Sequence, residues 1–247
     1  IRGGILGSWR WYFRGERVLG NKIMEKMIQQ YDNMNNLENE LIEKIVAILN
    51  ESIKTKGEAK ILLSGGNTPR KMYHKLSLQN IEWDKVHIGL VDERFVDKES
   101  PLCNEKMIRD TLIQNQASKA ILIGMLFEDD YEQNLLKAKK HYKLFSQADI
   151  LILGMGDDGH TASIFPNDPM SDIASKETQA DLSNTNAPSE PVQRITLNKS
   201  FITECQNVFL MFNGQNKGVV FEKSIEMGSP IHHFIPKLNT VYYAHNA

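Results

Sequence analysis

The sequence predicts an α/β fold built on a Rossmann-like, open and mostly parallel sheet with helices on both faces. Short apolar segments alternate with longer segments of helical periodicity, and this alternation is typical of parallel strands joined by right-handed crossovers. Residues 150–153 form a continuous apolar run, as expected for a central strand buried on both faces. Glycines and polar residues follow several of these runs, at the sheet edge where open α/β folds bind ligands.

The first half of the chain contains three units of strand, polar turn and helix. Before them, Leu37, Leu41 and Ile45 recur one helical turn apart, which predicts an amphipathic helix over residues 35–53. Apolar runs predict the strands, and segments with apolar residues three or four positions apart predict the helices. We expect strands at 59–63, 86–91 and 120–123, followed by helices at 70–76, 104–113 and 131–145 respectively.

The second half continues the alternation but is interrupted by one long polar segment. Residues 149–153 form the apolar strand from which the predicted site extends. Residues 167–193 are rich in Asn, Asp, Pro, Ser and Thr and lack sustained periodicity, which predicts a surface loop. Further apolar runs predict strands at 194–197, 208–212 and 240–244, with a helix at 215–226.

Composition limits the classes of function. A chain of 247 residues, 41% hydrophobic, can bury one large core, so we expect a single catalytic domain over residues 24–247. The net charge of −2 provides no basic field for nucleic acid or an anionic membrane. Cys103 and Cys205 lack metal or redox spacing, and no apolar run approaches the roughly 18 residues of a membrane span. We expect a cytoplasmic protein, either a monomer or a weak homo-oligomer.

Residues 1–23 differ from the rest of the chain. They are basic and glycine-rich, and they contain two tryptophans. The segment has no apolar core followed by a small-residue cleavage site, which argues against a secretory signal. We expect it to be a disordered extension, or a product of how the reading frame was assigned.

The first candidate binding element is the glycine turn at residues 64–70. Gly65 and Gly66 lie between a strand and a helix, and Asn67 and Thr68 add side-chain donors. Backbone N–H groups and the positive end of a helix dipole together suit a phosphate. The alternative is an ordinary turn, with Thr68 as the helix N-cap and Pro69 in the first helical position.

The second candidate element is Asp92-Glu93-Arg94, at the end of a predicted strand. The guanidinium of Arg94 could bind a phosphate or carboxylate with two parallel hydrogen bonds. The alternative is a strand end held by salt bridges. Its expected place at the same sheet edge as the glycine turn favours a binding role.

The third element begins with residues 154–159, which match the pattern GxGxxG after a strand, and His160 follows. A dinucleotide site is disfavoured because Asp157 and Asp158 would lie beside a pyrophosphate, and Pro166 shortens the following helix. A metal is also disfavoured, because Asp158 and His160 have no second His or Cys at close spacing; we expect no cofactor. His160 instead suits a general base that is oriented by Asp92 or Asp158.

These three blocks, with Asn104 downstream of the second, resemble those of the 6-phosphogluconolactonases in order and spacing. Residues 194–197 and 214–217 resemble later blocks of that family, so the likeness runs from about residue 35 onward. The resemblance implies hydrolysis of 6-phosphoglucono-1,5-lactone in the pentose phosphate pathway, without a required metal. It implies a sugar-phosphate lactone as the partner and His160 as the group that activates water, helped by Asp158 and Asp92. The implied phosphate ligands are Gly65, Gly66, Asn67, Thr68, Arg94, Arg194 and Lys217.

Two alternatives to this activity remain. The related glucosamine-6-phosphate deaminases have a similar histidine turn, but with a glutamate five residues after the histidine. Phe165 occupies that place here, and Asp92-Glu93-Arg94 replaces the DEY-like strand end of the deaminases; both departures favour the lactonase. A sugar-phosphate sensor without catalysis is the other alternative, and it predicts ligand binding without turnover.

Overall fold

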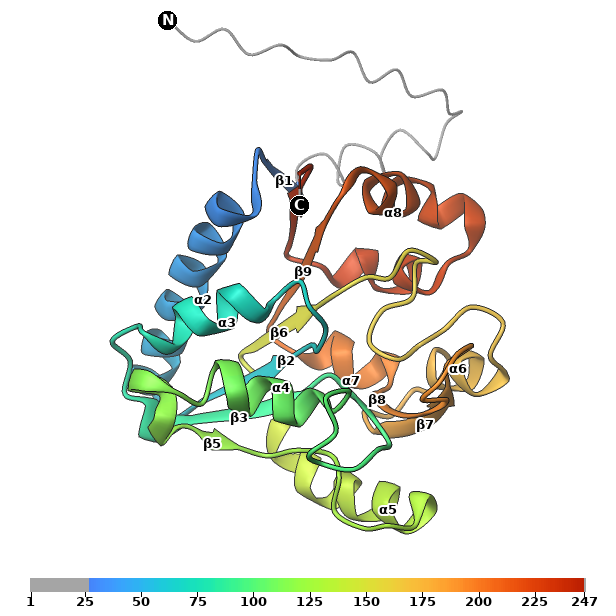
Figure 1. Ribbon diagram of the computed structural model, residues 1–247, viewed down its shortest axis with the longest axis horizontal. Helices are drawn as coiled ribbons and strands as arrows, with labels where there is room; N and C mark the ends of the chain where they lie inside the picture. The colour runs from blue at the N-terminus through green and yellow to red at the C-terminus, as the bar shows by residue number, and fades with distance from the viewer. Residues whose placement is uncertain (1–26, 247) are drawn as a thin grey trace, which may run out of the picture.

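The computed structural model describes residues 27–246 of the chain (Figure 1). The prediction that residues 1–23 are a disordered extension therefore lies outside the described residues. Within them, buried residues of all layers form one hydrophobic cluster, which includes Ile61 and Phe209 of one sheet and Ile195 of another. None of the helices in the described part of the chain is long and apolar enough to cross a membrane.

The main sheet has seven strands, and every neighbouring pair is parallel. This confirms the predicted open, mostly parallel sheet. The central strands are apolar on both faces, as in β6, where all four residues are buried. In spatial order the strands are β1 (Ile28–Tyr31), β10 (Thr240–Ala244), β9 (Asn207–Asn213), β6 (Ile150–Leu153), β2 (Ala59–Leu63), β3 (Val86–Leu90) and β5 (Ile121–Leu122).

Helices cover both faces of this sheet, as predicted. The chain moves one way across the sheet through β2, β3 and β5, so right-handed connections place α2 (Met34–Lys56), α3 (Arg70–Ser77) and α4 (Asn104–Thr111) on one face. Figure 1 shows α2 beside α3, and these two helices are in contact. The chain then returns through β6, β9 and β10, which places the connecting helices on the other face. These are α5 (Tyr131–Tyr142), η3 (Lys143–Phe145), α7 (Lys199–Glu204), α8 (Gln215–Met227) and η4 (Pro230–Lys237).

The direction of chain travel reverses between β2 and β6, which are neighbours in the sheet. Connections leave these two strands toward opposite faces, and such a switch point opens a crevice at the carboxyl ends of the strands. The glycine turn at residues 64–66 follows β2, and the segment that leads to His160 follows β6. The topology therefore brings two of the three predicted elements to one crevice.

A second, antiparallel sheet lies beside the first and corrects one prediction. It has the order β4 (Asp92–Arg94), β8 (Gln193–Leu197) and β7 (Leu182–Asn186). Residues 92–94 follow directly after β3, as predicted, and in addition form a strand of their own. The prediction of a surface loop over 167–193 is wrong, because the segment contains α6 (Pro169–Ala174) and β7. Asp168 caps α6 by accepting hydrogen bonds from the N–H groups of Met170 and Ser171, with Pro169 at the first helical position.

A buried carboxylate joins the main helix to the central strands. The helix α2 ends at Gly57, which has the left-handed φ of 82° favoured by glycine. Near this end, Asp149 accepts hydrogen bonds from the Ser52 hydroxyl at 2.9 Å and the Lys60 N–H at 2.8 Å, and it pairs with the Lys56 ammonium at 2.5 Å. Asp149 thus holds α2, β2 and the start of β6 in register.

Candidate active site

The crevice at the ends of β2 and β6 contains a cavity that continues into a second hollow. Eight of the predicted site residues line the cavity: Gly65, Gly66, Asn67, Thr68, Asp92, Arg94, His160 and Lys217. The other two, Asp158 and Arg194, line the adjoining hollow, and Asp92, Arg94 and His160 line both. The structure therefore brings all the predicted site residues together around His160.

The glycine turn after β2 is held open to the cavity by Ser64. The Ser64 hydroxyl donates to the carbonyl of Ile152 at 2.8 Å and accepts from the N–H of Gly154 at 3.3 Å, which ties the turn to β6. Gly66 has a φ of 93°, which side chains other than glycine adopt at a cost. The interpretation of Thr68 as the N-cap of α3 is wrong: Pro69 precedes the helix without a side-chain cap, and the Thr68 hydroxyl donates to Asn213 at 3.3 Å instead.

His160 lies on a tight turn after β6. The N–H of Gly156 donates to the carbonyl of His160 at 2.9 Å, and Gly159 has the positive φ of 77° that closes the turn. A second contact comes from the first turn of η4, where the N–H of Ile231 donates to the carbonyl of Gly159 at 3.0 Å. A side chain at Gly159 would collide with Ser229. The turn is thus fixed from within and from the C-terminal part of the chain.

Asp158 is the carboxylate that orients His160. Its Oδ1 lies 2.6 Å from Nδ1 of the imidazole and also accepts the backbone N–H of His160 at 3.0 Å. A carboxylate accepts hydrogen bonds, so Nδ1 carries the hydrogen and Nε2 is the nitrogen left free to accept a proton. Partial burial opposes ionisation of Asp158, but the hydrogen bonds and charge of His160 outweigh it and lower the pKa of Asp158.

Asp92 lies in the same cavity but has a different partner. Its buried carboxylate accepts a hydrogen bond from the Ser163 hydroxyl at 2.5 Å, and its backbone carbonyl accepts one from the Asn104 amide at 2.9 Å. Ser163 is a site residue that the sequence reasoning did not identify, although it lies only three positions after His160. Asn104 also lines the cavity, and its Oδ1 is buried without a hydrogen-bond partner among the described residues.

Glu93, the acid next to Asp92, joins β4 to α4. Its carboxylate accepts backbone N–H groups of Arg94 at 2.8 Å, Asn104 at 2.7 Å and Glu105 at 2.7 Å. Complete burial is the largest effect on its titration, and it raises the pKa of Glu93 to about 7 although these N–H groups favour the charged form. Glu93 thereby fixes the strand that carries Asp92 and Arg94.

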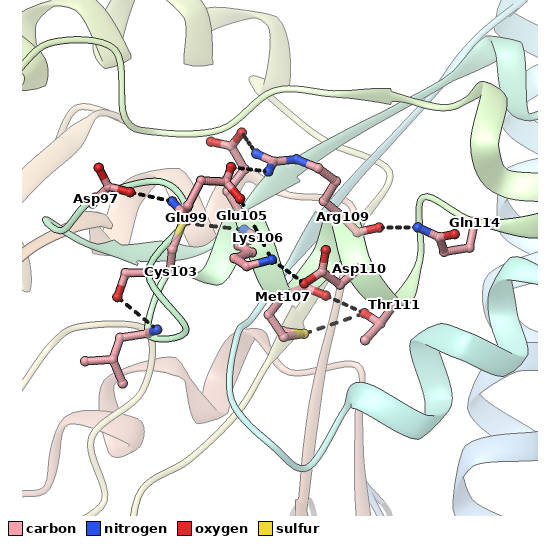
Figure 2. Close-up of polar contacts among 12 residues, drawn as sticks. Asp97, Glu99, Cys103, Glu105, Lys106, Met107, Arg109, Asp110, Thr111 and Gln114 are labelled. Atoms are coloured by element: carbon pink, nitrogen blue, oxygen red, sulfur yellow. Dashed lines mark hydrogen bonds and ion pairs between the residues drawn. The ribbon is translucent and has the colours of Figure 1, made fainter.

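Arg94 is held by the loop that precedes α4. Its Nη1 donates to the carbonyl of Leu102 at 2.6 Å. Figure 2 shows how this loop is bound to α4: Arg109 of the helix pairs with Glu99 of the loop at 3.1 Å, and a second pair within the helix, with Glu105 at 2.8 Å, orients Arg109. These pairs are partly exposed and individually weak.

Arg194 lies on β8 directly opposite Arg94 in the antiparallel register. Its side chain is largely buried, and its Nε has no hydrogen-bond partner among the described residues. Burial, followed by the adjacent charge of Arg94, lowers the pKa of Arg194. The guanidinium carbon lies 5.8 Å from the centre of the Phe165 ring, and that ring lies 4.7 Å from the imidazole of His160.

Among residues 27–246, no three His, Cys, Asp or Glu side chains are grouped closely enough to hold a metal ion. The arrangement does provide a base oriented by a carboxylate, a glycine turn with free donors and three cationic side chains. Fold and site together define an α/β enzyme equipped for acid–base chemistry on a small anionic ligand.

The chain belongs to the family of glucosamine-6-phosphate isomerases and 6-phosphogluconolactonases, whose model matches residues 32–241. It is 31% identical to the 6-phosphogluconolactonase of Helicobacter pylori (strain ATCC 700392 / 26695), over 88% of this chain and 97% of that protein. The 6-phosphogluconolactonase of Neisseria meningitidis serogroup A is 32% identical, over 80% of this chain and 87% of that protein. The crystal structure of a 6-phosphogluconolactonase from Shewanella baltica OS155 superposes with a TM-score of 0.83 at 33% identity, covering 90% of this chain and 97% of that one. The chain groups with the hydrolase branch of the family.

Proposed function

We propose that the chain hydrolyses 6-phosphoglucono-1,5-lactone to 6-phosphogluconate in the oxidative branch of the pentose phosphate pathway. The observation that carries this proposal is the His160–Asp158 pair, placed at the switch point of the sheet beside a glycine turn suited to a phosphate. The names of the relatives supply the substrate class.

In this mechanism Nε2 of His160 takes a proton from water as the water oxygen attacks the lactone carbonyl carbon. The carbonyl oxygen becomes an oxyanion, which needs positive charge or hydrogen-bond donors nearby. When the bond from carbon to the ring oxygen breaks, His160 returns the proton to that oxygen. Asp158 keeps Nδ1 protonated and stabilises the positive imidazolium that forms between these two steps. Asp92, held by Ser163, contributes a second carboxylate to the cavity that His160 lines.

The phosphate of the substrate would lie against the glycine turn. Gly65 and Gly66 leave the backbone accessible, Asn67 adds a side-chain donor, Thr68 lines the same cavity, and the positive end of α3 follows at once. Lys217, in the first turn of α8, lines the same cavity and supplies a full positive charge. Arg94 and Arg194 provide the remaining positive charge of the site.

The glutamate that the deaminase alternative requires is replaced by Phe165 in the sequence, and the fold places no carboxylate at that position. Phe165 is buried and packs against His160 at a ring separation of 4.7 Å, so an apolar ring occupies the place of the glutamate. The sensor alternative differs only in turnover, and the same assay separates it from the lactonase.

We further propose that the enzyme acts in the cytoplasm, as a monomer or a weak homo-oligomer and without a nucleic-acid partner. Cys103 and Cys205 are both free and buried, which suits a reducing compartment. The small net charge of −2 offers little attraction to nucleic acid.

A pH-stat assay tests the activity. Purified protein should hydrolyse the lactone above its spontaneous rate and should release no ammonia from glucosamine 6-phosphate. Ligand binding without turnover would support the sensor, and ammonia release would support the deaminase. Either result would overturn the proposal.

A further inference from the structure

The positive charge of the site is divided between two ends of the crevice. Lys217 and the glycine turn line the first cavity, whereas Arg194 lines only the adjoining hollow. His160 lies between them and lines both. A substrate with a phosphate at one end and a carbonyl at the other therefore has two distinct places for its two polar ends.

The buried guanidinium of Arg194 has a donor that, within the described part of the chain, is free to bind an acceptor from a ligand. Its guanidinium is largely buried, and its Nε has no hydrogen-bond partner among residues 27–246. Arg94 lies opposite on the neighbouring strand, and like charges in that position destabilise a sheet. Leaving a buried charged donor unpaired is costly as well. An acceptor bound between the two guanidinium groups would relieve both effects.

The surroundings of Arg194 decide which end of the substrate this acceptor belongs to. Asp157 and Asp158 line the same hollow, and their carboxylates would repel a dianionic phosphate. The cavity of Lys217 has a glycine turn and neither of these carboxylates among its lining residues. The phosphate is therefore favoured in the first cavity, and a singly charged oxygen is favoured beside Arg194.

Phe165 relates Arg194 to the reacting atoms. The ring of Phe165 contacts the imidazole of His160 on one side, and the guanidinium of Arg194 lies 5.8 Å from the ring centre. Arg194 and the base are thus neighbours of the same ring, and both line the same hollow. The carbon attacked by water must lie within reach of that base, which favours a place for its oxygen in the hollow that Arg194 lines.

On the basis of the proposed function, we propose that Arg194 is a catalytic residue that binds the reacting end of the substrate. It receives the lactone carbonyl oxygen, its charge stabilises the oxyanion, and it then holds the carboxylate of the product. Lys217 and the glycine turn bind the phosphate at the other end. No bond to Arg194 forms or breaks in these steps.

Two ligands that differ only at the reacting end test this division. 6-Phosphogluconate has both a phosphate and a carboxylate, whereas glucitol 6-phosphate has a hydroxymethyl group in place of the carboxylate. Arg194→Met keeps an apolar stem over Phe165, and Lys217→Met is the matched control at the other end. Titration calorimetry should show that Arg194→Met weakens the binding of 6-phosphogluconate by about 10 to 100-fold, as expected for a lost charge-assisted hydrogen bond. The affinity for glucitol 6-phosphate should stay within about twofold of that of the unmodified protein. Lys217→Met should weaken both ligands by similar factors.

The inference is overturned if Arg194→Met weakens both ligands equally, because Arg194 would then bind the phosphate. Circular dichroism and urea unfolding show whether each variant folds, and Arg194→Lys, which keeps the charge, should recover part of the affinity. Lactone turnover by the unmodified protein shows whether a failed test concerns only the role of Arg194 or the proposed function itself. If turnover is present and the ligand pattern is reversed, only the role of Arg194 fails. If turnover is absent and neither ligand binds, the proposed function fails with it.

Discussion

Replacing Gly65 by alanine should damage the site through a single methyl group. A Cβ at this position would lie far inside van der Waals contact with Oδ1 and Cγ of Asn104, and 2.6 Å from its Nδ2. The Asn104 amide would have to move, which breaks its 2.9 Å hydrogen bond to the carbonyl of Asp92. Overpacking costs about 1 to 3 kcal/mol and a lost buried hydrogen bond about 1 kcal/mol. We expect Gly65→Ala to lower the free energy of unfolding by about 2 to 4 kcal/mol and to displace Asp92.

Urea unfolding and lactone hydrolysis together measure this effect. Gly154→Ala is the matched control, because Gly154 lines the same cavity, has no positive φ and has no atom within 4 Å of an added Cβ. The double variant Gly65→Ala/Asn104→Ala removes the clash, so its loss of stability should be smaller than the sum of the two single losses. The reasoning is refuted if Gly65→Ala is as stable as Gly154→Ala, or if the two single effects simply add.

Three further predictions concern individual ionisable groups. His160→Ala should lower kcat by about 10² to 10⁴-fold while 6-phosphogluconate still binds; a variant with normal turnover would remove His160 from the mechanism. The pKa of Glu93 is raised from 4.5 to about 7, so the folded state holds more protons than the unfolded state between these values, and stability falls as the pH rises through them. Between pH 5 and pH 8 the free energy of unfolding of the natural protein should fall by up to about 3 kcal/mol more than that of Glu93→Gln. The same pH dependence in both proteins would contradict this. Asp149→Ala should lower the free energy of unfolding in urea by about 2 to 3 kcal/mol because it leaves the buried Ser52 hydroxyl and the partly buried Lys60 N–H without their acceptor, and Asp149→Asn, which retains an acceptor, should cost less.

The main sheet was predictable because its strands are apolar on both faces. Runs such as residues 59–63 and 150–153 carry that signal within a few adjacent positions. The second sheet lacks it. β7 has the sequence LSNTN and depends on distant partners, including backbone pairing with β8 and the hydrogen bond from the Thr185 hydroxyl to the carbonyl of Ser163. For α6 a local signal was present, since Asp168 followed by Pro169 is a helix start, but the polar composition around it concealed the signal.

The candidate site was predictable where a turn exposes its residues and less so where partners meet across the fold. Glycines flank His160 in sequence, so its exposure on a turn could be inferred. The choice between Asp92 and Asp158 as its partner depended on distances that spacing does not give, and the structure pairs His160 with Asp158. The hydrogen bond from Ser163 to Asp92 joins residues 71 positions apart, and no local sequence pattern predicts it.

The turn that carries His160 depends on residues that are synthesised well after it. Gly159 is braced by the N–H of Ile231, and β10 inserts between β1 and β9 to complete the main sheet. Ribosomes build chains from the amino end, so every candidate group as far as Lys217 emerges before these later residues. The brace on Gly159 and the last internal strand of the main sheet are therefore both supplied by the C-terminal residues, and the crevice as it stands in the structure requires them.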